Sequence, residues 1–582
     1  MHLKRFAVGC LFLPSILCAG VKTIEDFGGS ADGKTDNGPA LVKAFAFAKE
    51  NPGTTLSLGG ICRVMTPQTK DSVGSGFPMA AGAEGVTGLT IEDGEIVLGG
   101  PFGALFFQNC KDLTIRNVVF DYDPPILSQG RILSSDPAAR TMVLAPDPGY
   151  PSPDADHFPQ KAGSWLMALK PGGEPGFHFV GYIDDAKPGE NGQFVLTHDR
   201  ADLAQVLQGQ TDWRYVRMQR GYAHLNVFQF CDGIRMEGCS IHASSKFASL
   251  FVFCNDVVLR GNRICPRPGS GHLAATCADG FHFIGGRRGP LIENNFFNRV
   301  PDDNIVISLR GNRIKSYHGA VLEVLPASVT WYEVGDTIEV VEVGEGRRTE
   351  YKIAAMEPQK KLYQPVVLTL DRPVEGTIVT MAKDDPGTSP TLVFNKSWRL
   401  DGTVIRGNVF QNTRRYAVFM GAGGVTIENN VMSNHTSSAI LVSYMGTLKK
   451  EENVLIYYFS SDVVIRNNTI VNALNYGVGG RIFKSPRGAI ESNDNDSDKI
   501  GIGESRLPTR ISILDNLIVN SGSAGISITN SSDVTVAGNT ILFPNQQPQE
   551  KNYGITIEAS DVDLSKNVFL GPKIDEDVHQ AP

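Results

Sequence analysis

Short runs of alternating apolar and polar residues recur along the chain, and many of them are followed by an asparagine. Residues 425–432 read VTIENNVM, and residues 463–470 read VVIRNNTI. The same frame places an asparagine three positions beyond an apolar residue at Asn262, Asn295, Asn408, Asn430, Asn468, Asn516, Asn539 and Asn567. Alternation of this kind predicts short β-strands. Asparagine tolerates left-handed backbone, and its side chain can hydrogen-bond along a stack of equivalent turns.

A second apolar run follows many of these phrases, at residues 417–419, 439–441, 525–528 and 554–557. Asn408 and Asn430 are 22 positions apart, and Asn516 and Asn539 are 23 apart. A repeat of this length with two or three strands is typical of one coil of a parallel β-helix. A leucine-rich repeat would need a leucine consensus and a helix in each repeat, and neither is evident. We therefore predict an all-β protein, a right-handed parallel β-helix from about residue 86 to the C-terminus.

Two stretches interrupt the repeat, and each predicts a small antiparallel, barrel-like β module inserted between coils. Such a module either decorates the solenoid or walls a cleft, and the sequence leaves both open. The apolar spacing of residues 39–49 predicts a helix within a cap over the first coil. The expected organisation is a signal peptide at 1–20, a cap and first coils at 21–122, modules at 123–225 and 316–394, and further coils at 226–315 and 395–582.

The first twenty residues indicate export. Lys4 and Arg5 supply a positive start, residues 6–18 are largely apolar, and Ala19 and Gly20 are small. This is the pattern of a cleaved signal peptide, so we expect an exported protein. No later stretch reaches about 18 uninterrupted apolar residues, and no membrane span is predicted.

Charge and cysteine content argue against two further classes of function. The net charge is −8, and no basic patch of the kind that binds nucleic acid is present. Seven of the nine cysteines lie beyond the expected signal, and no CxxC pair occurs among them. This disfavours a zinc site, and the odd number leaves at least one thiol free.

Three aspartates are the candidate catalytic residues: Asp279, Asp302 and Asp303. The segments 279–284 and 303–308 align as the second phrase of consecutive coils, 24 positions apart. Equivalent positions on adjacent coils lie about 4.8 Å apart in the backbone. We therefore expect three carboxyl groups on one face, although aspartate is also common in turns with no catalytic role.

Gathering like charges is costly unless one group holds a proton. That difference in proton affinity is what glycoside hydrolysis needs, because one carboxyl group protonates the leaving oxygen and one carboxylate activates water. Inverting enzymes hold acid and base about 6.5–9.5 Å apart. Side chains on neighbouring coils can span that range.

The pattern of Ala278-Asp279-Gly280, followed one coil later by Asp302-Asp303, in a β-helix with two inserted β modules, resembles the α-1,3-galactosidases of glycoside hydrolase family 110. The resemblance covers most of the chain beyond residue 20. It implies a bacterial, exported, inverting enzyme without a metal or other cofactor, which releases terminal α-1,3-linked galactose, as in blood group B structures. By matched position, Asp302 is the expected acid, and Asp279 and Asp303 hold and activate the water.

Four further residues are candidates for binding the sugar: Lys246, His282, Arg415 and Tyr416. Arg415 and Tyr416 align with Asp302 and Asp303 in the coil after the second module, and Tyr416 could stack on a sugar face. Lys246 lies one coil before Asp279. His282 alternates with two phenylalanines and should point away from the core, into the cleft or to solvent.

Three other functions stay open from the sequence. Polygalacturonases also use an Asp and an Asp-Asp pair on consecutive coils, but they add a Gly-His-Gly motif that this chain lacks, and Arg313 follows the pair too soon to match their Arg-Ile-Lys motif. A non-catalytic, glycan-binding β-helix would need no convergent carboxylates. A pectate-type lyase would need calcium ligands and a basic proton acceptor, and none is evident in register. The expected partner is in every case a carbohydrate, and the oligomeric state is not predicted.

Overall fold

The computed structural model describes residues 20–73, 76–155, 158, 164–169, 177–198, 213–219, 223–326, 328–380, 391–442, 457–475, 487–492, 506–547, 549, 551–558 and 560–581. The predicted signal peptide lies outside the described residues, apart from Gly20. Among the residues described, no helix has the length and apolar character required to cross a membrane.

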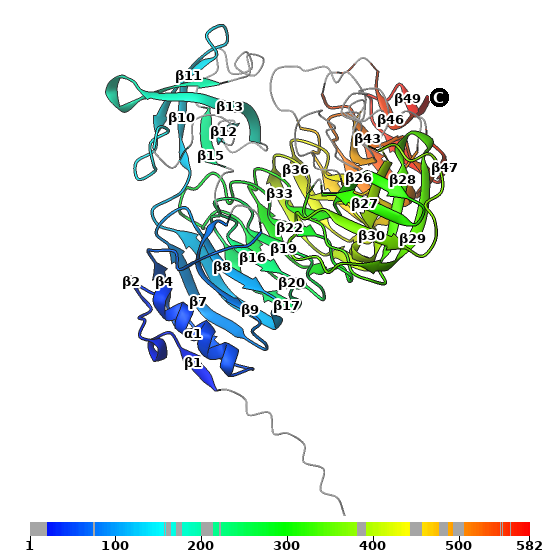
Figure 1. The fold of residues 1–582 in the computed structure, drawn as a ribbon. Coiled ribbons are helices and arrows are strands. Elements are labelled where there is room, and N and C mark those ends of the chain that lie inside the picture. Colours follow the sequence, from blue (N-terminus) through cyan, green and yellow to red (C-terminus); the bar gives the residue numbers. More distant parts are fainter. Residues whose placement is uncertain are drawn as a thin grey trace, which may run out of the picture.

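Stacked coils form an elongated solenoid along which the chain advances from one end to the other (Figure 1). Strands from successive coils form one long sheet of 13 strands. All its pairings are parallel except that between its two N-terminal strands. Its strands are β5 (Thr69–Lys70), β6 (Pro78–Glu84), β8 (Gly103–Gln108), β16 (Asn226–Gln229), β19 (Ser249–Val252), β22 (Phe281–Ile284), β25 (Ile305–Ser308), β34 (Val418–Gly421), β37 (Ile440–Val442), β40 (Gly488–Ser492), β43 (Ala524–Thr529), β46 (Tyr553–Glu558) and β49 (Glu576–Ala581).

The remaining faces of the coils form a parallel sheet of 24 strands. The strands are β1 (Val21–Thr23), β2 (Asp32–Asp36), β3 (Thr55–Ser57), β4 (Ile61–Val64), β7 (Thr90–Leu98), β9 (Lys111–Tyr122), β17 (Asp232–Glu237), β18 (Ser240–Ile241), β20 (Val258–Arg260), β21 (Arg263–Ile264), β23 (Leu291–Glu293), β24 (Phe296–Asn298), β32 (Thr403–Arg406), β33 (Val409–Thr413), β35 (Gly423–Glu428), β36 (Val431–His435), β38 (Ser461–Arg466), β39 (Thr469–Val471), β41 (Thr509–Leu514), β42 (Leu517–Val519), β44 (Ser532–Ala537), β45 (Thr540–Leu542), β47 (Val562–Ser565) and β48 (Val568–Leu570). The parallel β-helix predicted from the repeat is confirmed.

The solenoid begins earlier than the repeat indicated. Strand β1 already pairs in parallel with β3, which pairs with β7, so parallel pairing starts at Val21 and not near residue 86. The first coils lack the repeated asparagine, so the sequence pattern did not identify them. Helix α1 (Gly38–Glu50) forms where a helix was predicted and buries Leu41 and Phe45, whereas Val42 is exposed. Short 3-10 helices occur at Glu25–Phe27, Glu190–Gly192, Val343–Glu345 and Lys396–Trp398.

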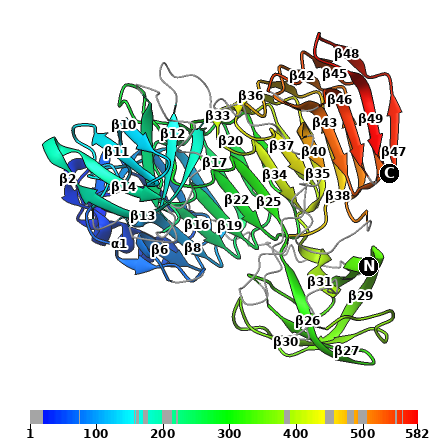
Figure 2. The same ribbon diagram turned by 90° about the horizontal axis from the view of Figure 1, so that it is seen from above.

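Two closed antiparallel barrels project from the solenoid, as Figure 2 shows from above. The first contains β10 (Ser128–Asp136), β11 (Thr141–Pro146), β12 (Ser164–Leu169), β13 (Phe177–Pro188), β14 (Phe194–His198) and β15 (Arg214–Gln219). The second contains β26 (Gly311–His318), β27 (Val321–Leu325), β28 (Thr337–Glu342), β29 (Arg347–Met356), β30 (Val366–Leu370) and β31 (Thr391–Asn395). The second barrel therefore begins at Gly311, inside the segment expected to belong to the coils.

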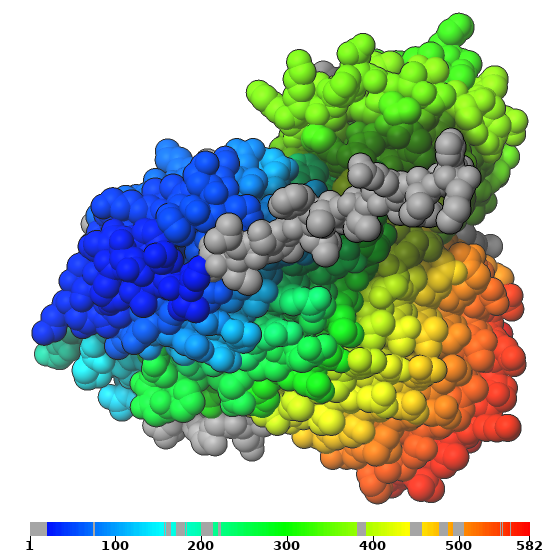
Figure 3. Space-filling model, turned by 90° about the horizontal axis from the view of Figure 1, so that it is seen from below, coloured from blue at the N-terminus to red at the C-terminus, as the bar shows by residue number. Residues whose placement is uncertain are grey.

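Aromatic side chains stack in the solenoid core from coil to coil. Phe228 and Phe251 are 5.0 Å apart between ring centroids with an interplanar angle of 6°, and Phe251 and Phe283 are 4.5 Å apart at 9°. Each ring occupies the same position of its strand, so the parallel register brings them face to face. The described cysteines are all buried free thiols. Figure 3 shows the coils as successive bands from blue to red, with the green second barrel beside them.

The repeated asparagines stack along one edge of the solenoid. The side-chain oxygen of Asn468 accepts hydrogen bonds from the backbone and side-chain nitrogens of Asn430, both at 3.0 Å. The side-chain nitrogen of Asn468 donates to Ile427 O and to Asn516 Oδ1, both at 3.0 Å. The same pattern joins consecutive asparagines from Asn262 to Asn567. This ladder satisfies polar groups that are otherwise buried.

Left-handed backbone falls one residue before the ladder asparagine, and not on it as the sequence suggested. Asn429 and Asn467 have φ values of 56° and 55°, and Gly407 has 64°. The ladder position needs a buried amide, whereas the preceding position needs only a residue that tolerates positive φ. This explains why that residue is Asn, Asp, Gly or Lys in different coils.

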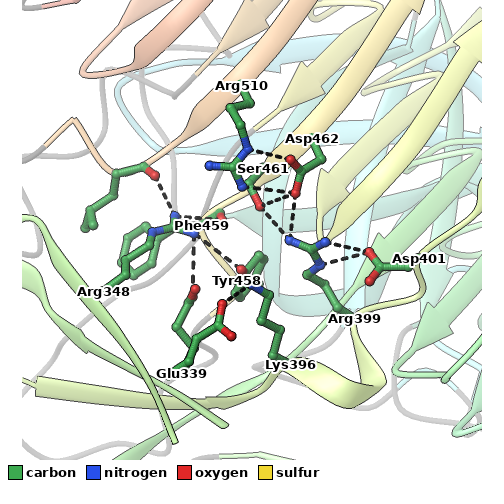
Figure 4. Close-up of polar contacts among 12 residues, drawn as sticks. Glu339, Arg348, Lys396, Arg399, Asp401, Tyr458, Phe459, Ser461, Asp462 and Arg510 are labelled. Carbon is green, nitrogen blue, oxygen red and sulfur yellow. Dashed lines mark hydrogen bonds and ion pairs between the residues drawn. The ribbon is translucent and has the colours of Figure 1, made fainter. Parts of the chain in front are cut away.

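Arginines fix the second barrel to the solenoid (Figure 4). Arg348 of β29 donates to the backbone oxygens of Phe459 and Leu507 at 2.9 and 2.5 Å. Arg399, just after the barrel, donates to Asp462 at 2.9 Å, and Arg510 binds the same carboxylate at 2.5 Å. Charge-assisted contacts of this kind give a defined orientation to the barrel.

We expect Asn468→Ala to destabilise the fold clearly. It removes both halves of a ladder step and leaves buried donors and acceptors unpaired, at about 1–3 kcal/mol for each such group. The measurement is the melting temperature by circular dichroism. The matched control is Asn567→Ala, at the half-buried end of the ladder, whose effect should be smaller. Equal losses in the two variants would contradict a cooperative ladder.

Candidate active site

The three predicted aspartates meet on the outer face of the solenoid, at the start of adjacent strands of the 13-stranded sheet. Phe281 pairs with Ile305, and Ile305 pairs with Val418. Counting back two residues places Asp279, Asp303 and Tyr416 in one column, while Asp302 aligns with Arg415. One oxygen atom from each of the three aspartates lies within 4.8 Å of the others. The prediction from the repeat register that the three carboxyl groups lie together is therefore confirmed.

All three carboxyl groups are buried, with Asp279 at 5%, Asp302 at 0% and Asp303 at 4% exposure. The backbone N–H of Asp303 donates to Asp279 Oδ1 at 3.3 Å. The distance between these carboxyl oxygens, at most 4.8 Å, is shorter than the 6.5–9.5 Å expected between the acid and the base of an inverting enzyme. The reason is that adjacent coils bring the carboxyl groups side by side.

Arginines compensate the charge of the adjacent pair. Arg415 Nη1 lies 3.1 Å from Asp302 Oδ1 and 3.4 Å from Asp303 Oδ2. Arg414 Nη2 lies 3.2 Å from the same oxygen of Asp302. Arg414 in turn stacks on Trp165 of β12, with its guanidinium carbon 5.0 Å from the ring centroid. The first barrel therefore contributes to the surroundings of the site.

Burial raises the pKa of Asp303 to about 8, and the charges of Asp302 and Asp279 act in the same direction. Arg415 and the backbone N–H of Tyr416 oppose this rise. Although burial alone disfavours its charge, the neighbouring carboxylates hold the pKa of Arg415 well above its usual value. The cluster thus retains a proton near neutral pH and keeps its arginine charged.

His282 is buried, at 4% exposure, where the sequence suggested an exposed or cleft-facing side chain. It does point away from the solenoid core, but Phe247 covers it in a parallel stack at 4.6 Å. His282 Nδ1 lies 2.7 Å from Asp279 Oδ2, and Nε2 lies 3.3 Å from Arg310 Nη2. A guanidinium can only donate, so Nε2 accepts and Nδ1–H donates to Asp279. The imidazole is thereby a neutral tautomer that holds Asp279 in place.

The other two sugar-binding candidates lie near the cluster in different roles. Tyr416 is 4% exposed and packs beside Phe419, so it forms part of the floor and not an open stacking platform. Lys246 is half-buried, with its ammonium 5.2 Å from the ring centroid of Phe77.

Sequence reasoning missed Arg310, Arg414, Trp165 and Phe247. Arg310 and Arg414 lie next to predicted features, but only the folded chain shows that Arg414 contacts Asp302 and that Arg310 contacts His282. Trp165 lies more than a hundred positions from Asp279 and reaches the site through the first barrel. No periodicity connects it with the coils, so no local signal could have identified it.

Comparisons with known proteins agree with the fold. Residues 392–569 match the family described as "Right handed beta helix region". The sequence is 25% identical to Alpha-1,3-galactosidase B of Akkermansia muciniphila over 246 residues, which are 40% of this chain and 28% of that protein. The chain thus matches less than a third of the length of this relative.

Three solved structures with a similar course of the chain are distant in sequence. The A-module of mannuronan C-5 epimerase AlgE6 from Azotobacter vinelandii is 12% identical, with a TM-score of 0.39, over 94% of this chain and 99% of that chain. An exopolygalacturonase from Thermotoga maritima is 11% identical, with a TM-score of 0.41, over 96% and 93%. The adhesin PfbA of Streptococcus pneumoniae is 11% identical, with a TM-score of 0.41, over 95% and 90%. Likeness at this level carries no argument about activity.

We expect Asp303→Asn to change how stability depends on pH. The folded protein binds a proton at Asp303 more tightly than the unfolded chain does, so wild-type stability falls as pH rises between the ordinary value, near 4, and about 8. Asparagine mimics the protonated form and removes this loss. The melting temperature of the variant relative to wild type should therefore increase from pH 5 to pH 8. A pH-independent difference would contradict the raised pKa.

Proposed function

We propose that this protein is a glycoside hydrolase that acts through Asp279, Asp302 and Asp303. The observation that carries the proposal is the buried convergence of the three carboxyl groups beside Arg415. Such a cluster can hold a transferable proton and a water-activating carboxylate together, which glycosidic cleavage requires. The partial similarity to an α-1,3-galactosidase and the sequence pattern support a finer proposal, the exo-acting release of terminal α-1,3-linked galactose.

We assign the acid to Asp302 and the positioning of water to Asp279 and Asp303, from the resemblance. Asp279 suits the positioning of water. His282 donates a hydrogen bond to one of its carboxylate oxygens and so favours the ionised form, which can accept a hydrogen bond from the water. Asp302 contacts two guanidinium groups, which favour its ionised form, whereas the raised pKa belongs to Asp303. Adjoining carboxyl groups titrate as a set, so the proton of the cluster is available to either member of the pair.

The assignment also requires that Asp302 can reach the leaving oxygen of the sugar. Asp302 is fully buried behind Arg414 and Arg415. To protonate a leaving oxygen, it requires a bound sugar to displace one of these guanidinium groups. If Asp303 delivers the proton instead, the sugar displaces Arg415, which lies 3.4 Å from its Oδ2. The variants below separate the two cases.

Inversion is part of the proposal. The oxygen atoms lie closer together than in the usual inverting pair, but the usual spacing applies to carboxyl groups that face each other across a sugar. Here the groups stand side by side on consecutive coils. Water held by Asp279 and Asp303 would attack one face of the sugar while the departing oxygen takes its proton from Asp302.

Two other functions predict different outcomes. A polygalacturonase-like enzyme would cleave galacturonate polymers and not neutral galactosides. A non-catalytic glycan-binding β-helix would bind sugar without turnover.

Export to the periplasm or beyond stays a proposal based on residues 1–20.

We expect Asp302→Asn to lower turnover of a natural disaccharide by a factor of roughly 10² or more. A nitrophenyl galactoside has a good leaving group and needs little protonation, so this variant should be partly spared on it. Asp279→Asn and Asp303→Asn should be impaired on both substrates, because water attack is still required. If Asp303→Asn is the spared variant, the acid and water-positioning roles are exchanged. Near wild-type activity in all three variants would refute the mechanism.

Purified protein should release galactose from an α-1,3-galactoside such as a blood group B oligosaccharide, and NMR should show the β anomer first. The α anomer would contradict inversion.

The three carboxylates lie close enough to share a cation, but the arginines already balance their charge, so activity should survive EDTA. Loss on chelation that calcium restores would favour a lyase instead. Cleavage of galacturonate polymers alone would favour the polygalacturonase-like alternative.

A further inference from the structure

Arg310 is a buried arginine beside the acid cluster whose hydrogen-bonding capacity is largely unused. It lies two residues beyond the end of β25 and is 4% exposed. Its guanidinium carbon lies 3.8 Å from the ring centroid of Tyr457, and Nη2 lies 3.3 Å from His282 Nε2. The buried nitrogens Nε and Nη1 have no hydrogen-bond partner within the described part of the chain. Buried donors are normally paired, so two unpaired donors on one side chain call for a ligand.

Asp71 presents the complementary case. It is 4% exposed and comes from the segment between β5 and β6. Its Oδ1 accepts the backbone N–H of Phe77 at 3.3 Å, while the buried Oδ2 has no partner among the described residues. Burial is the main reason that the pKa of Asp71 rises to about 6. Asp71 thus offers an unsatisfied buried acceptor, as Arg310 offers unsatisfied buried donors.

A chain of side-chain contacts connects the two groups. The ammonium of Lys246 lies 5.2 Å from the ring centroid of Phe77, whose backbone N–H binds Asp71, and 5.7 Å from that of Phe247, which stacks on His282 at 4.6 Å. The charges of Arg310 and Asp71 both act on Tyr363 of the second barrel, in opposite directions. Lys246 acts on Asp71 and on His224, and His282 acts on His224 as well. His282 contacts Arg310 directly. We call these six side chains, Asp71, His224, Lys246, His282, Arg310 and Tyr363, the ring.

We propose that this ring is a subsite for the neutral sugar whose glycosidic bond is cleaved, with Arg310 donating to its hydroxyl oxygens and Asp71 accepting from a hydroxyl. A hydroxyl group both accepts and donates, so a polyol satisfies the two residues together. A carboxylate would satisfy Arg310 but meet Asp71 with like charge.

The subsite rests on the proposed glycosidase function, but it can be tested without turnover. Binding of free galactose, glucose and galacturonate to the whole protein is measured by titration calorimetry. Galactose should bind at millimolar concentration, and more tightly than galacturonate. Asp71→Asn replaces the unpaired acceptor by a donor of the same size, and Arg310→Met removes the donors. Each should weaken galactose binding by about tenfold or more, the scale of losing a hydrogen bond to a charged group.

Arg235→Met, on an exposed arginine of β17, is the matched control and should bind galactose like wild type. Melting temperatures check that the variants are folded, and Arg310→Lys gives a second variant that keeps the charge and should recover part of the binding. Unchanged galactose binding in Asp71→Asn and Arg310→Met overturns the subsite, as does the absence of sugar binding by wild type. Tighter binding of galacturonate that depends on Arg310 overturns the neutral-sugar assignment. Sugar binding that follows these expectations without any hydrolysis supports the subsite and refutes the proposed function.

Discussion

The parallel register between coils is the constraint on which the rest of this structure depends. Backbone hydrogen bonds hold consecutive coils about 4.8 Å apart, so any position repeated in the sequence becomes a column in space. In the core the column is a stack of phenylalanine rings, and at one edge it is a ladder of amides. On the outer face the same column contains Phe247, Asp279, Asp303 and Tyr416. One geometric rule therefore gives both the stability of the solenoid and the convergence of its acids.

That convergence has an electrostatic cost, which neighbouring residues offset locally. Three carboxyl groups with almost no solvent access would repel one another if all were ionised. Arg415 contacts two of them, the neutral His282 donates to the third, and Asp303 tends to keep its proton. A site arranged in this way trades stability for a shared proton, which is what acid–base chemistry needs.

The first barrel has a role beyond decoration, because one of its side chains reaches the surroundings of the acid cluster. Trp165 of the first barrel stacks on Arg414, which itself contacts Asp302. The second barrel begins at Gly311, directly after Arg310, and arginine contacts such as those of Arg348 hold it against the coils. The first insertion therefore brings to the surroundings of the acids a side chain that the repeat itself does not supply.

The sequence by itself determined the coil, the asparagine ladder and the positions of the three aspartates, because a repeat with fixed register converts sequence spacing directly into distance. It did not reveal the first coils, where the asparagine phrase is missing, or that His282 would be covered by Phe247. Only the tertiary structure decided which charges meet the aspartates. Arg310 and Trp165 reach the site through turns and barrels, where no periodicity links position in the chain to position in space.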